Sequence, residues 1–535
     1  MTTALPPVVD RLSVSAIYAL LFTGAALAVL ALGWLLDPVP RIHDEHAHLL
    51  AGHTFARGQL ANESHAYADH FAAINVLSEP VYASKFPPGQ GLVIALGLLA
   101  FDYAHAGIAL SAGAFMCALF FMLTRLHSRR WALWGCALAG VQMVLFGYWG
   151  TTFWGGYVAA TGGALVAGVC LDAWRNARID IKFTIVLMIG LWLLSVSRPM
   201  YGVVMATPFI VLWLVQLWRS RRRSSVVGPI LVFMIGGVGI LGFQATYNYA
   251  ITGQPHVFPH SLYQATYGHP AIFMWSQQGA PKNEGKNEKF YFVHDAFEPE
   301  SVVEARTNPM QHVGLKGLVH WLFFVGPFCS ILLLGLRGVA RVARYRFVLG
   351  VTGMILVFDL ITPWLMPHYI APVAALVVCL LTACAGVLYS RFARVPALRI
   401  AIAGFPLILL ALYCVLQGWQ LRSTPKELWL DRWIFFQEID TQPNRDRQRI
   451  AAHLAADGRE HIVLVPQQRP LPQSMRHNGW VNNMVPIDEQ SVLWAWDLGA
   501  DANAPFLADY PQRSVWRLTF DASGRGSIDA WEASP

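Results

Sequence analysis

Residues 13–36 read SVSAIYALLFTGAALAVLALGWLL and contain no charged side chain. About 20 apolar residues are enough for a helix to cross the hydrocarbon core of a bilayer, so this stretch predicts a membrane span. It is too long for the core of a signal peptide and lacks a small-x-small cleavage site, and we therefore expect it to be retained as an anchor. Residues 37–58 read DPVPRIHDEHAHLLAGHTFARG, and this polar, histidine-rich composition predicts the start of a loop outside the bilayer.

The composition of the whole chain also indicates a membrane protein. Only 13% of its 535 residues are charged and 55% are hydrophobic, whereas soluble domains carry roughly 25% charged residues. This leaves too few charges to cover a soluble globule, and the many aromatic and aliphatic residues exclude a disordered chain. The seven cysteines form no CxxC pair and lie in apolar runs, which favours small buried side chains over a disulfide framework or a metal site.

Apolar runs separated by polar loops continue to about residue 420. They predict an all-α polytopic membrane bundle of about 11 transmembrane helices, at residues 13–36, 105–124, 131–148, 156–174, 183–197, 202–218, 226–248, 317–336, 347–362, 370–390 and 400–418. Residues 89–101 are apolar but too short to span a bilayer, so we expect an interfacial helix on the outer leaflet.

Arginine residues set the predicted orientation of the bundle. The loops after the second, fourth, sixth, eighth and tenth spans are rich in arginine, whereas the other loops are long or almost uncharged. Positive loops stay in the cytoplasm, which predicts a multi-pass protein of the inner (cytoplasmic) membrane with a cytoplasmic N-terminus. Residues 37–104 and 249–316 are then outer loops, and we expect part of the second to cover a cavity.

The chain divides into two parts by charge. Residues 1–420 carry a net charge of +10 and form the predicted membrane domain, whereas residues 421–535 carry −3. In this second part, short apolar runs at 462–465, 491–496 and 514–520 alternate with polar helical stretches, which predicts a small extracytoplasmic α/β domain. Because topology explains the positive charge of the membrane domain, we expect no nucleic-acid partner.

The first outer loop contains adjacent carboxylates, Asp44 and Glu45, directly after the first span. Apolar spacing predicts a helix from Glu45 onwards, so Asp44 lies at or near its N-cap, where the helix dipole stabilises a carboxylate. Alternatively, the pair activates a hydroxyl group or holds a divalent cation. Six histidines lie in the same loop, and they either bind a metal, for example His46 together with Asp44, or line a pocket as ordinary polar residues.

Three further positions are candidates for substrate binding. Lys85 is the only lysine before residue 182 and is followed closely by two prolines; it either binds a phosphate or reaches to lipid headgroups. Tyr82 opens the same segment. Trp154 lies in an aromatic outer turn, where it belongs either to an interfacial belt or to a surface that stacks on a sugar. Asp359, the one acid deep in an apolar run, either lines a cavity or makes a structural hydrogen bond.

In combination, these motifs resemble the C-type (GT-C) membrane glycosyltransferases, which include protein O-mannosyltransferases and the aminoarabinose transferases of lipid A. The shared features are the Asp-Glu pair after the first span and the Lys85-Phe-Pro-Pro segment that opens an interfacial helix. Two more follow in order on the outer face, the segments Ser197-Arg198-Pro199 and His368-Tyr369-Ile-Ala-Pro372. The resemblance covers about residues 10–420. Phe86 separates Lys85 from the prolines, and Arg198 replaces a lysine.

The resemblance implies transfer of a sugar from a polyprenyl-phosphate donor to a lipid, glycan or protein acceptor outside the cytoplasm. Asp44 would be the general base, with Glu45 assisting it or orienting the acceptor. Lys85 and Arg198 would stabilise the departing phosphate, which develops charge in the transition state. His368 and Tyr369 would line the same site, and a divalent cation on Asp44 stays possible.

Two other functions stay open at this point. A transporter or flippase for a lipid-linked sugar predicts charges along the whole depth of the bundle, whereas this sequence concentrates them at the outer face. A polysaccharide ligase, which uses a polyprenyl diphosphate donor, usually has an arginine-rich outer loop, and the outer arginines here are scattered. The enzyme is therefore the preferred interpretation.

Overall fold

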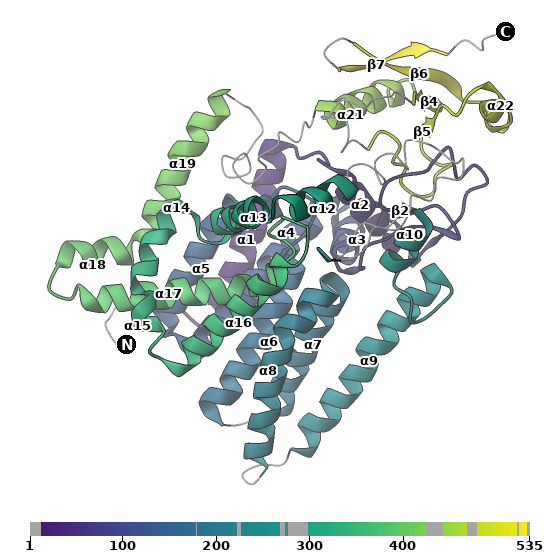
Figure 1. Ribbon diagram of the computed structural model, residues 1–535. Helices are drawn as coiled ribbons and strands as arrows, with labels where there is room; N and C mark the ends of the chain where they lie inside the picture. The colour runs from purple at the N-terminus through teal and green to yellow at the C-terminus, as the bar shows by residue number, and fades with distance from the viewer. Residues whose placement is uncertain are drawn as a thin grey trace.

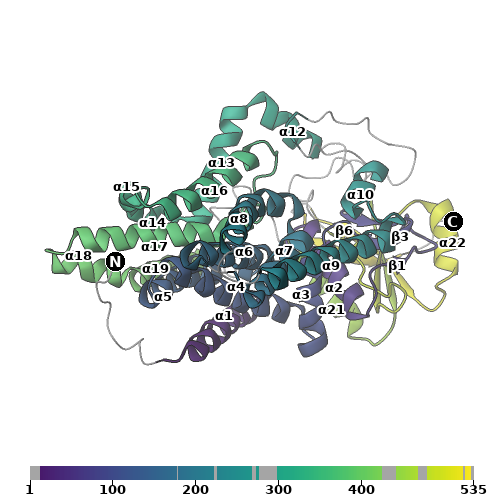
Figure 2. The same ribbon diagram turned by 90° about the horizontal axis from the view of Figure 1, so that it is seen from below.

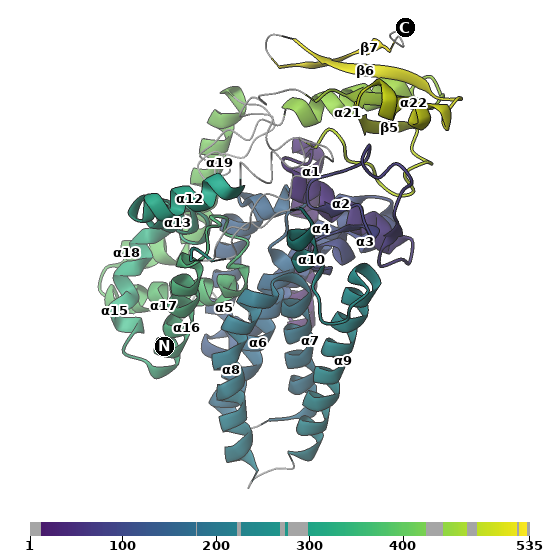
Figure 3. The same ribbon diagram turned by 45° about the vertical axis from the view of Figure 1, so that its right-hand side comes forward.

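The computed structural model describes residues 12–177, 179–221, 226–267, 273–275, 298–423, 442–467, 479–521 and 524–531. The described chain is mostly helical, with a four-stranded sheet near the C-terminus (Figure 1). Helices α6 to α9 extend away from that sheet (Figure 3). Seen from below, the sheet and strands β1 and β3 lie at one side of the molecule and helices α15, α17 and α18 at the other (Figure 2).

Within the described residues, six helices are long and apolar enough to cross a membrane, or up to eight if two bent pairs each count as one span. The six are α1 (Val14–Leu36), α4 (Ala104–Leu126), α6 (Tyr157–Asn176), α8 (Pro199–Ser220), α9 (Val227–Thr252) and Ala371–Arg391, which combines η6 (Ala371–Val373) with α17 (Ala374–Arg391). The chain is therefore a multi-pass membrane protein by length and composition of its helices.

The remaining predicted spans also coincide with helices, but with shorter, bent or more charged ones. The bent pairs are α13 (Pro309–Phe324) with Gly326–Val339, at 83°, and α18 (Pro396–Ala403) with α19 (Phe405–Ser423), at 64° over the apolar part. Helix α5 (Arg129–Ala139) continues as a π-helix at Gly140–Leu145, α7 spans Ile181–Ser197, and α16 spans Ala343–Leu360. The number of eleven spans accordingly stays a prediction.

The loop at residues 37–104, for which an outer location stays a prediction, contains two helices and three short strands. Helix α2 spans His43–Ala56 and α3 spans Gly89–Phe101, the segment expected to be interfacial. Strand β3 (Val81–Ser84) pairs antiparallel with β1 (Asn62–Glu63) and with β2 (Val76–Leu77). Helices α2 and α3 approach closely because Gly52 lacks the Cβ that would collide with Ile94. This packing fixes the segment that carries the Asp-Glu pair.

The C-terminal sheet has the order β5-β4-β6-β7. Strands β4 (His461–Val465), β5 (Val492–Trp496) and β6 (Ser514–Phe520) are parallel, and β7 (Gly526–Ala530) is antiparallel to β6. Central strand β4 is buried along its whole length, as expected for a strand covered on both faces. Helices α21 (Gln442–Ala455) and α22 (Ala500–Ala508) lie beside the sheet (Figure 1). Strands β4, β5 and β6 lie at the three predicted runs, β7 was not predicted, and the division of the chain into two domains stays a prediction.

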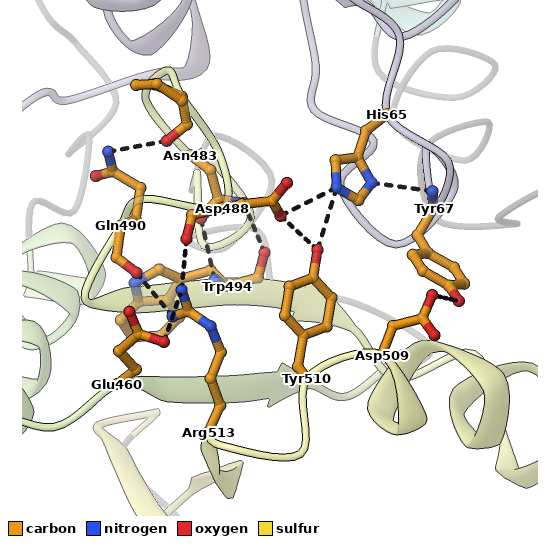
Figure 4. A network of polar contacts seen from close by, with 11 residues as sticks. His65, Tyr67, Glu460, Asn483, Asp488, Gln490, Trp494, Asp509, Tyr510 and Arg513 are labelled. Carbon is orange, nitrogen blue, oxygen red and sulfur yellow. Dashed lines mark hydrogen bonds and ion pairs between the residues drawn. The ribbon is translucent and has the colours of Figure 1, made fainter.

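Polar contacts join this sheet region to the loop at residues 37–104 (Figure 4). His65 Nε2 lies 3.2 Å from the carboxylate of Asp488 and 3.1 Å from the hydroxyl of Tyr510. The hydroxyl of Tyr67 donates to Asp509 at 2.5 Å. The backbone N–H of Trp496 donates to the carbonyl of His70 at 2.9 Å. The loop between α2 and α3 is thus held by the C-terminal region.

Candidate functional site

Glu45 anchors the first turn of α2. Its side chain is fully buried, and its two oxygens accept hydrogen bonds from the backbone N–H groups of Arg41, at 2.9 Å, and Phe153, at 2.7 Å. Burial raises the pKa of Glu45 to about 7, although both hydrogen bonds act in the opposite direction. Since Phe153 belongs to the aromatic turn before α6, Glu45 joins α2 to that turn.

Asp44 lies beside Glu45 and has different partners. Its Oδ2 accepts a hydrogen bond of 2.9 Å from the indole Nε1 of Trp154, and its Oδ1 accepts one of 2.5 Å from the amide of Asn75. His43 Nε2 lies 3.4 Å from the same Oδ1. The side chain of Asp44 is 14% exposed, so Asp44 is the more accessible acid of the pair.

Lys85 is a buried cation whose backbone is hydrogen-bonded to that of Asn75. Its Nζ lies 4.5 Å from the ring centre of Tyr263 and 5.5 Å from that of Phe86. The backbone N–H of Lys85 donates to the carbonyl of Asn75, whose own N–H donates to the hydroxyl of Tyr263 at 2.8 Å. No carboxylate of the described residues forms an ion pair with Lys85, and aromatic faces stabilise its charge instead.

Arg198 lies where α7 ends and α8 begins, and its backbone (φ −139°, ψ 68°) is outside both the helical and the extended region, directly before Pro199 at the first helical position. Its guanidinium lies 4.7 Å from the ring centre of Tyr369. The neighbouring His368 is fully buried, and its ring centre lies 4.6 Å from those of Tyr369 and of Trp154. The segments of Arg198 and His368, far apart in sequence, therefore meet at Tyr369, and His368 connects them with Trp154, whose indole donates to Asp44.

His48 is the last residue of this group of side chains. One turn of α2 after Asp44, it stacks on Phe86 at 4.6 Å between ring centres. Burial, and then the charge of Arg198, lowers the pKa of His48 to about 3. Contacts link Arg198, Tyr369, His368, Trp154, Asp44, Asn75, Lys85, Phe86 and His48 in this order, and the charge of Arg198 also acts on His48; we call this group the polar ring. It brings together Asp44, Lys85, Trp154, Arg198, His368 and Tyr369 of the predicted site residues.

Two predicted site residues lie elsewhere. The hydroxyl of Tyr82 donates to the carbonyl of Asn483 at 3.1 Å, and its ring packs with the C-terminal region. His46 Nε2 lies 3.4 Å from the amide oxygen of Asn444, on the side of α2 that faces the C-terminal region. Burial, followed by the charge of Arg447, lowers the pKa of His46 to about 3. Both side chains contribute to the contact between the loop and the C-terminal region.

The donor set near Asp44 does not fit the predicted divalent cation. In the part of the chain that the structure describes, no three His, Cys, Asp or Glu side chains gather as metal ligands. His46, the expected partner, faces Asn444 instead. Both oxygens of Asp44 already accept hydrogen bonds, and no step below involves a metal.

Sequence reasoning missed several members of the polar ring. Asn75, which connects Asp44 with Lys85, belongs to no motif, and its left-handed backbone (φ 65°) cannot be read from the residue type alone. His48 was weighed only as one of six loop histidines. Tyr263, in α10 (Pro259–Tyr267), belongs to the second outer loop, which was expected to cover the site; residues 268–272 and 276–297 of that loop lie outside the described residues.

Asp359 lies in a second buried cluster next to the polar ring. Its carboxylate accepts a hydrogen bond of 2.6 Å from Tyr201 and one of 2.8 Å from His320, and it lies 3.3 Å from Lys316 Nζ. The ring of Tyr201 is 6.3 Å from that of Tyr369. Of the two interpretations, structural hydrogen bonding is therefore the one that the contacts support.

Comparison with known proteins identifies similar structures. No protein-family model matches the sequence, and no curated protein matches it in sequence. The chain is similar to ArnT from Cupriavidus metallidurans, with 14% identity and a TM-score of 0.47 in the apo state, covering 96% of this chain and 94% of that one. The ArnT structure bound to undecaprenyl phosphate has 13% identity and a TM-score of 0.47, over 96% and 97% of the two chains.

A second similar structure is an oligosaccharyltransferase from Archaeoglobus fulgidus, in complex with Zn and sulfate. It has 10% identity and a TM-score of 0.43, over 95% of this chain and 73% of that one. The function proposed below follows from the polar ring of this chain.

Proposed function

We propose that this protein is a membrane glycosyltransferase that moves a sugar from a polyprenyl-phosphate donor to an acceptor hydroxyl at the extracytoplasmic face. The observation that carries the proposal is the polar ring, which unites one accessible carboxylate with two cations from separate segments. Asp44, Lys85 and Arg198 come from α2, from the residue after β3 and from the α7–α8 junction, respectively. Asn75 and Trp154 connect them through hydrogen bonds and ring contacts.

The two cations would stabilise the charge of the leaving group. When the bond between the anomeric carbon and the phosphate oxygen breaks, the polyprenyl phosphate gains negative charge. Fixed cations in a largely buried site stabilise that charge more than they stabilise the intact donor. Lys85 and Arg198 are held over aromatic rings, without a carboxylate of the described residues in ion-pair contact, so their charge is available for the phosphate.

The carboxylate suits the acceptor. Asp44 would accept the proton of the acceptor hydroxyl while the hydroxyl oxygen attacks the anomeric carbon, and this attack inverts the configuration at that carbon. Hydrogen bonds from Asn75 and Trp154 orient the carboxylate and favour its ionised form. Glu45, which binds two backbone N–H groups, would position Asp44 by fixing the start of α2.

The proposed location follows from the distribution of charge. We place the protein in the inner membrane with the polar ring and the C-terminal region outside the cytoplasm, since the arginine-rich loops belong in the cytoplasm. A donor that diffuses within the membrane reaches such a site without a nucleotide-binding domain. The acceptor would be a lipid, a glycan or a protein of the cell envelope.

The test uses purified full-length protein with synthetic undecaprenyl-phosphate mannose and an extract of envelope glycans and lipids. Release of undecaprenyl phosphate and transfer of mannose are measured. We expect Asp44→Asn to lose at least about 100-fold in transfer, the range of a general base, while donor binding persists. Lys85→Met and Arg198→Met should weaken the binding of undecaprenyl phosphate.

Asp172→Asn is the matched control. Asp172 is a buried carboxylate paired with Arg125 at 3.0 Å, near the arginine-rich end of α4 and away from the polar ring. Its loss should leave transfer and binding unchanged. Normal transfer by Asp44→Asn would overturn the assignment of the base, and movement of intact donor across proteoliposomes without phosphate release would favour a flippase.

A further inference from the structure

Two histidines of the polar ring have a ring nitrogen without a hydrogen-bond partner in the described part of the chain. These atoms are Nδ1 of His48 and Nε2 of His368, and both are buried. His48 is 5% exposed and His368 is 0% exposed. Native proteins rarely leave buried polar atoms unpaired, because the lost hydration is not replaced. Oδ1 of Asn75 is a third such atom in the polar ring, and together these atoms indicate that a ligand supplies the missing partners.

The contacts of Tyr148 orient the ring of His368. The tyrosine hydroxyl accepts the backbone N–H of His368 at 3.1 Å and lies 2.9 Å from its Nδ1. These two contacts fix the orientation of the imidazole, and both tautomers of His368 are compatible with them. In either tautomer, Nε2 of His368 is a buried hydrogen-bonding atom without a partner among the described residues.

Both imidazoles are uncharged. Burial, together with the positive charge of Arg198, holds the pKa of His48 at about 3 and that of His368 well below its usual value. A neutral imidazole offers one donor and one acceptor, which match hydroxyl groups on both counts. A phosphate offers acceptors only, and in this ring Lys85 and Arg198 already suit it.

We propose that His48 and His368 bind the hydroxyl groups of the sugar that the donor carries, and that this sugar is uncharged. This inference rests on the proposed glycosyltransferase function and adds a sugar subsite to it. The subsite lies between the two arms of the ring: His48 stacks on Phe86, next to Lys85, and the ring of His368 lies tilted against that of Tyr369, which carries Arg198 on its face.

The charges of the ring exclude a cationic sugar from this subsite. Lys85 and Arg198 are already present, and an ammonium group would add a third positive charge close to them. Glu45 is bound to two backbone N–H groups, so Asp44 is the one accessible carboxylate of the two. The two cations of the ring outnumber this carboxylate, so an amino sugar would meet a net positive charge.

The experiment compares three probes on the purified full-length protein: undecaprenyl phosphate, undecaprenyl-phosphate mannose, and the same mannose donor with one sugar hydroxyl replaced by an amine. Equilibrium binding is measured for wild type, His48→Phe and His368→Phe. Phenylalanine keeps the aromatic stacking and removes the ring nitrogens. His127→Phe is the control, because the two nitrogens of this buried histidine contact Cys379 and Tyr345 away from the ring.

We expect wild type to bind the mannose donor more tightly than undecaprenyl phosphate, and more tightly than the amino donor. Each ring variant should lose about tenfold in affinity for the mannose donor, the equivalent of one hydrogen bond, and keep its affinity for undecaprenyl phosphate. His127→Phe should change neither. Equal losses for both probes, or tighter binding of the amino donor, would overturn the inference and leave the proposed function intact. Failure of wild type to bind undecaprenyl phosphate at all would overturn both.

Discussion

The indole of Trp154 donates a hydrogen bond of 2.9 Å to the carboxylate of Asp44, across 110 residues of sequence. The same indole contacts His368, with 4.6 Å between ring centres. One side chain therefore orients the proposed base and, at the same time, touches the arm of the polar ring that contains Arg198. Trp154 thus connects the proposed base with the part of the site that contains Arg198.

The substitution Trp154→Phe should distinguish the effects of these two contacts. The ring contact with His368 persists and the hydrogen bond to the carboxylate is lost. Hydrogen bonds to charged groups contribute about 1.5–3 kcal/mol, so we expect the rate constant of transfer to fall about 10- to 100-fold. Donor affinity should change little. Steady-state kinetics with undecaprenyl-phosphate mannose measures both quantities.

Trp149→Phe is the matched control for that experiment. Trp149 is fully buried in the same turn, and its Nε1 has no hydrogen-bond partner among the described residues. Its replacement removes no hydrogen bond from the site and should leave the rate of transfer near that of wild type. Equal losses in the two variants would mean that packing of the turn, and not the bond to Asp44, determines the rate.

Much of the helical scaffold could be predicted because apolar periodicity depends on local sequence. Residues 13–36 and 89–101 form helices within one residue of the expected bounds. The site was harder to predict, because the contacts of Asn75 depend on a left-handed turn and on packing between distant segments. His48 could have been recognised from its position one helical turn after Asp44, on the same face of α2.

Tyr82 shows how strand geometry corrects a prediction from proximity in sequence. It lies three residues before Lys85, and β3 alternates its side chains between two faces. Tyr82 packs with the C-terminal region, whereas the next residue, Ala83, packs in the cluster that contains Tyr263, the aromatic partner of Lys85. The odd spacing therefore puts Tyr82 and Lys85 on opposite sides of the strand.

The raised pKa of Glu45 predicts a pH-dependent stability. Its pKa is about 7 in the folded protein and 4.5 in the unfolded chain, so the folded state holds the proton more tightly. The stabilisation is complete below pH 4.5 and is lost as the pH rises through about 7. A difference of this size corresponds to roughly 3 kcal/mol. We expect the unfolding temperature of wild type, relative to Glu45→Gln, to fall between pH 5 and pH 8.

Thermal unfolding of the detergent-solubilised protein tests this expectation. Glu63→Gln serves as the control, since Glu63 is an exposed carboxylate of β1 in the same loop. Its difference from wild type should not vary with pH. A constant difference for Glu45→Gln as well would show that Glu45 does not bind a proton more tightly in the folded protein.

The buried pair of Lys316 and Asp359 predicts a strong energetic coupling. The two side chains are 0% and 1% exposed, and Lys316 also donates to the carbonyls of Asp359 and Thr362 at 2.6 and 2.7 Å. Removing one partner leaves a buried charge, so Lys316→Met should destabilise the protein by about 3–5 kcal/mol. The double variant Lys316→Met/Asp359→Asn should recover part of that loss, as measured by a double-mutant cycle of unfolding free energies.

The pair of Arg125 and Asp172 provides the comparison for this cycle. Its arginine side chain is 23% exposed, so water screens the interaction and compensates for the loss of a partner. Coupling there should be about 1 kcal/mol or less. Equal coupling energies in the two cycles would contradict the view that burial makes the Lys316–Asp359 pair strong.

Tyr82→Phe should affect stability and leave catalysis unchanged. The substitution removes the hydrogen bond of 3.1 Å to the carbonyl of Asn483, which joins β3 to the C-terminal region. A hydrogen bond of this kind contributes about 1 kcal/mol, so limited proteolysis at the C-terminal region should become faster. The polar ring does not include Tyr82, and the kinetics of transfer should therefore match those of wild type. A fall in transfer comparable to that of Trp154→Phe would place Tyr82 in the substrate site after all and would show that the C-terminal region takes part in the reaction.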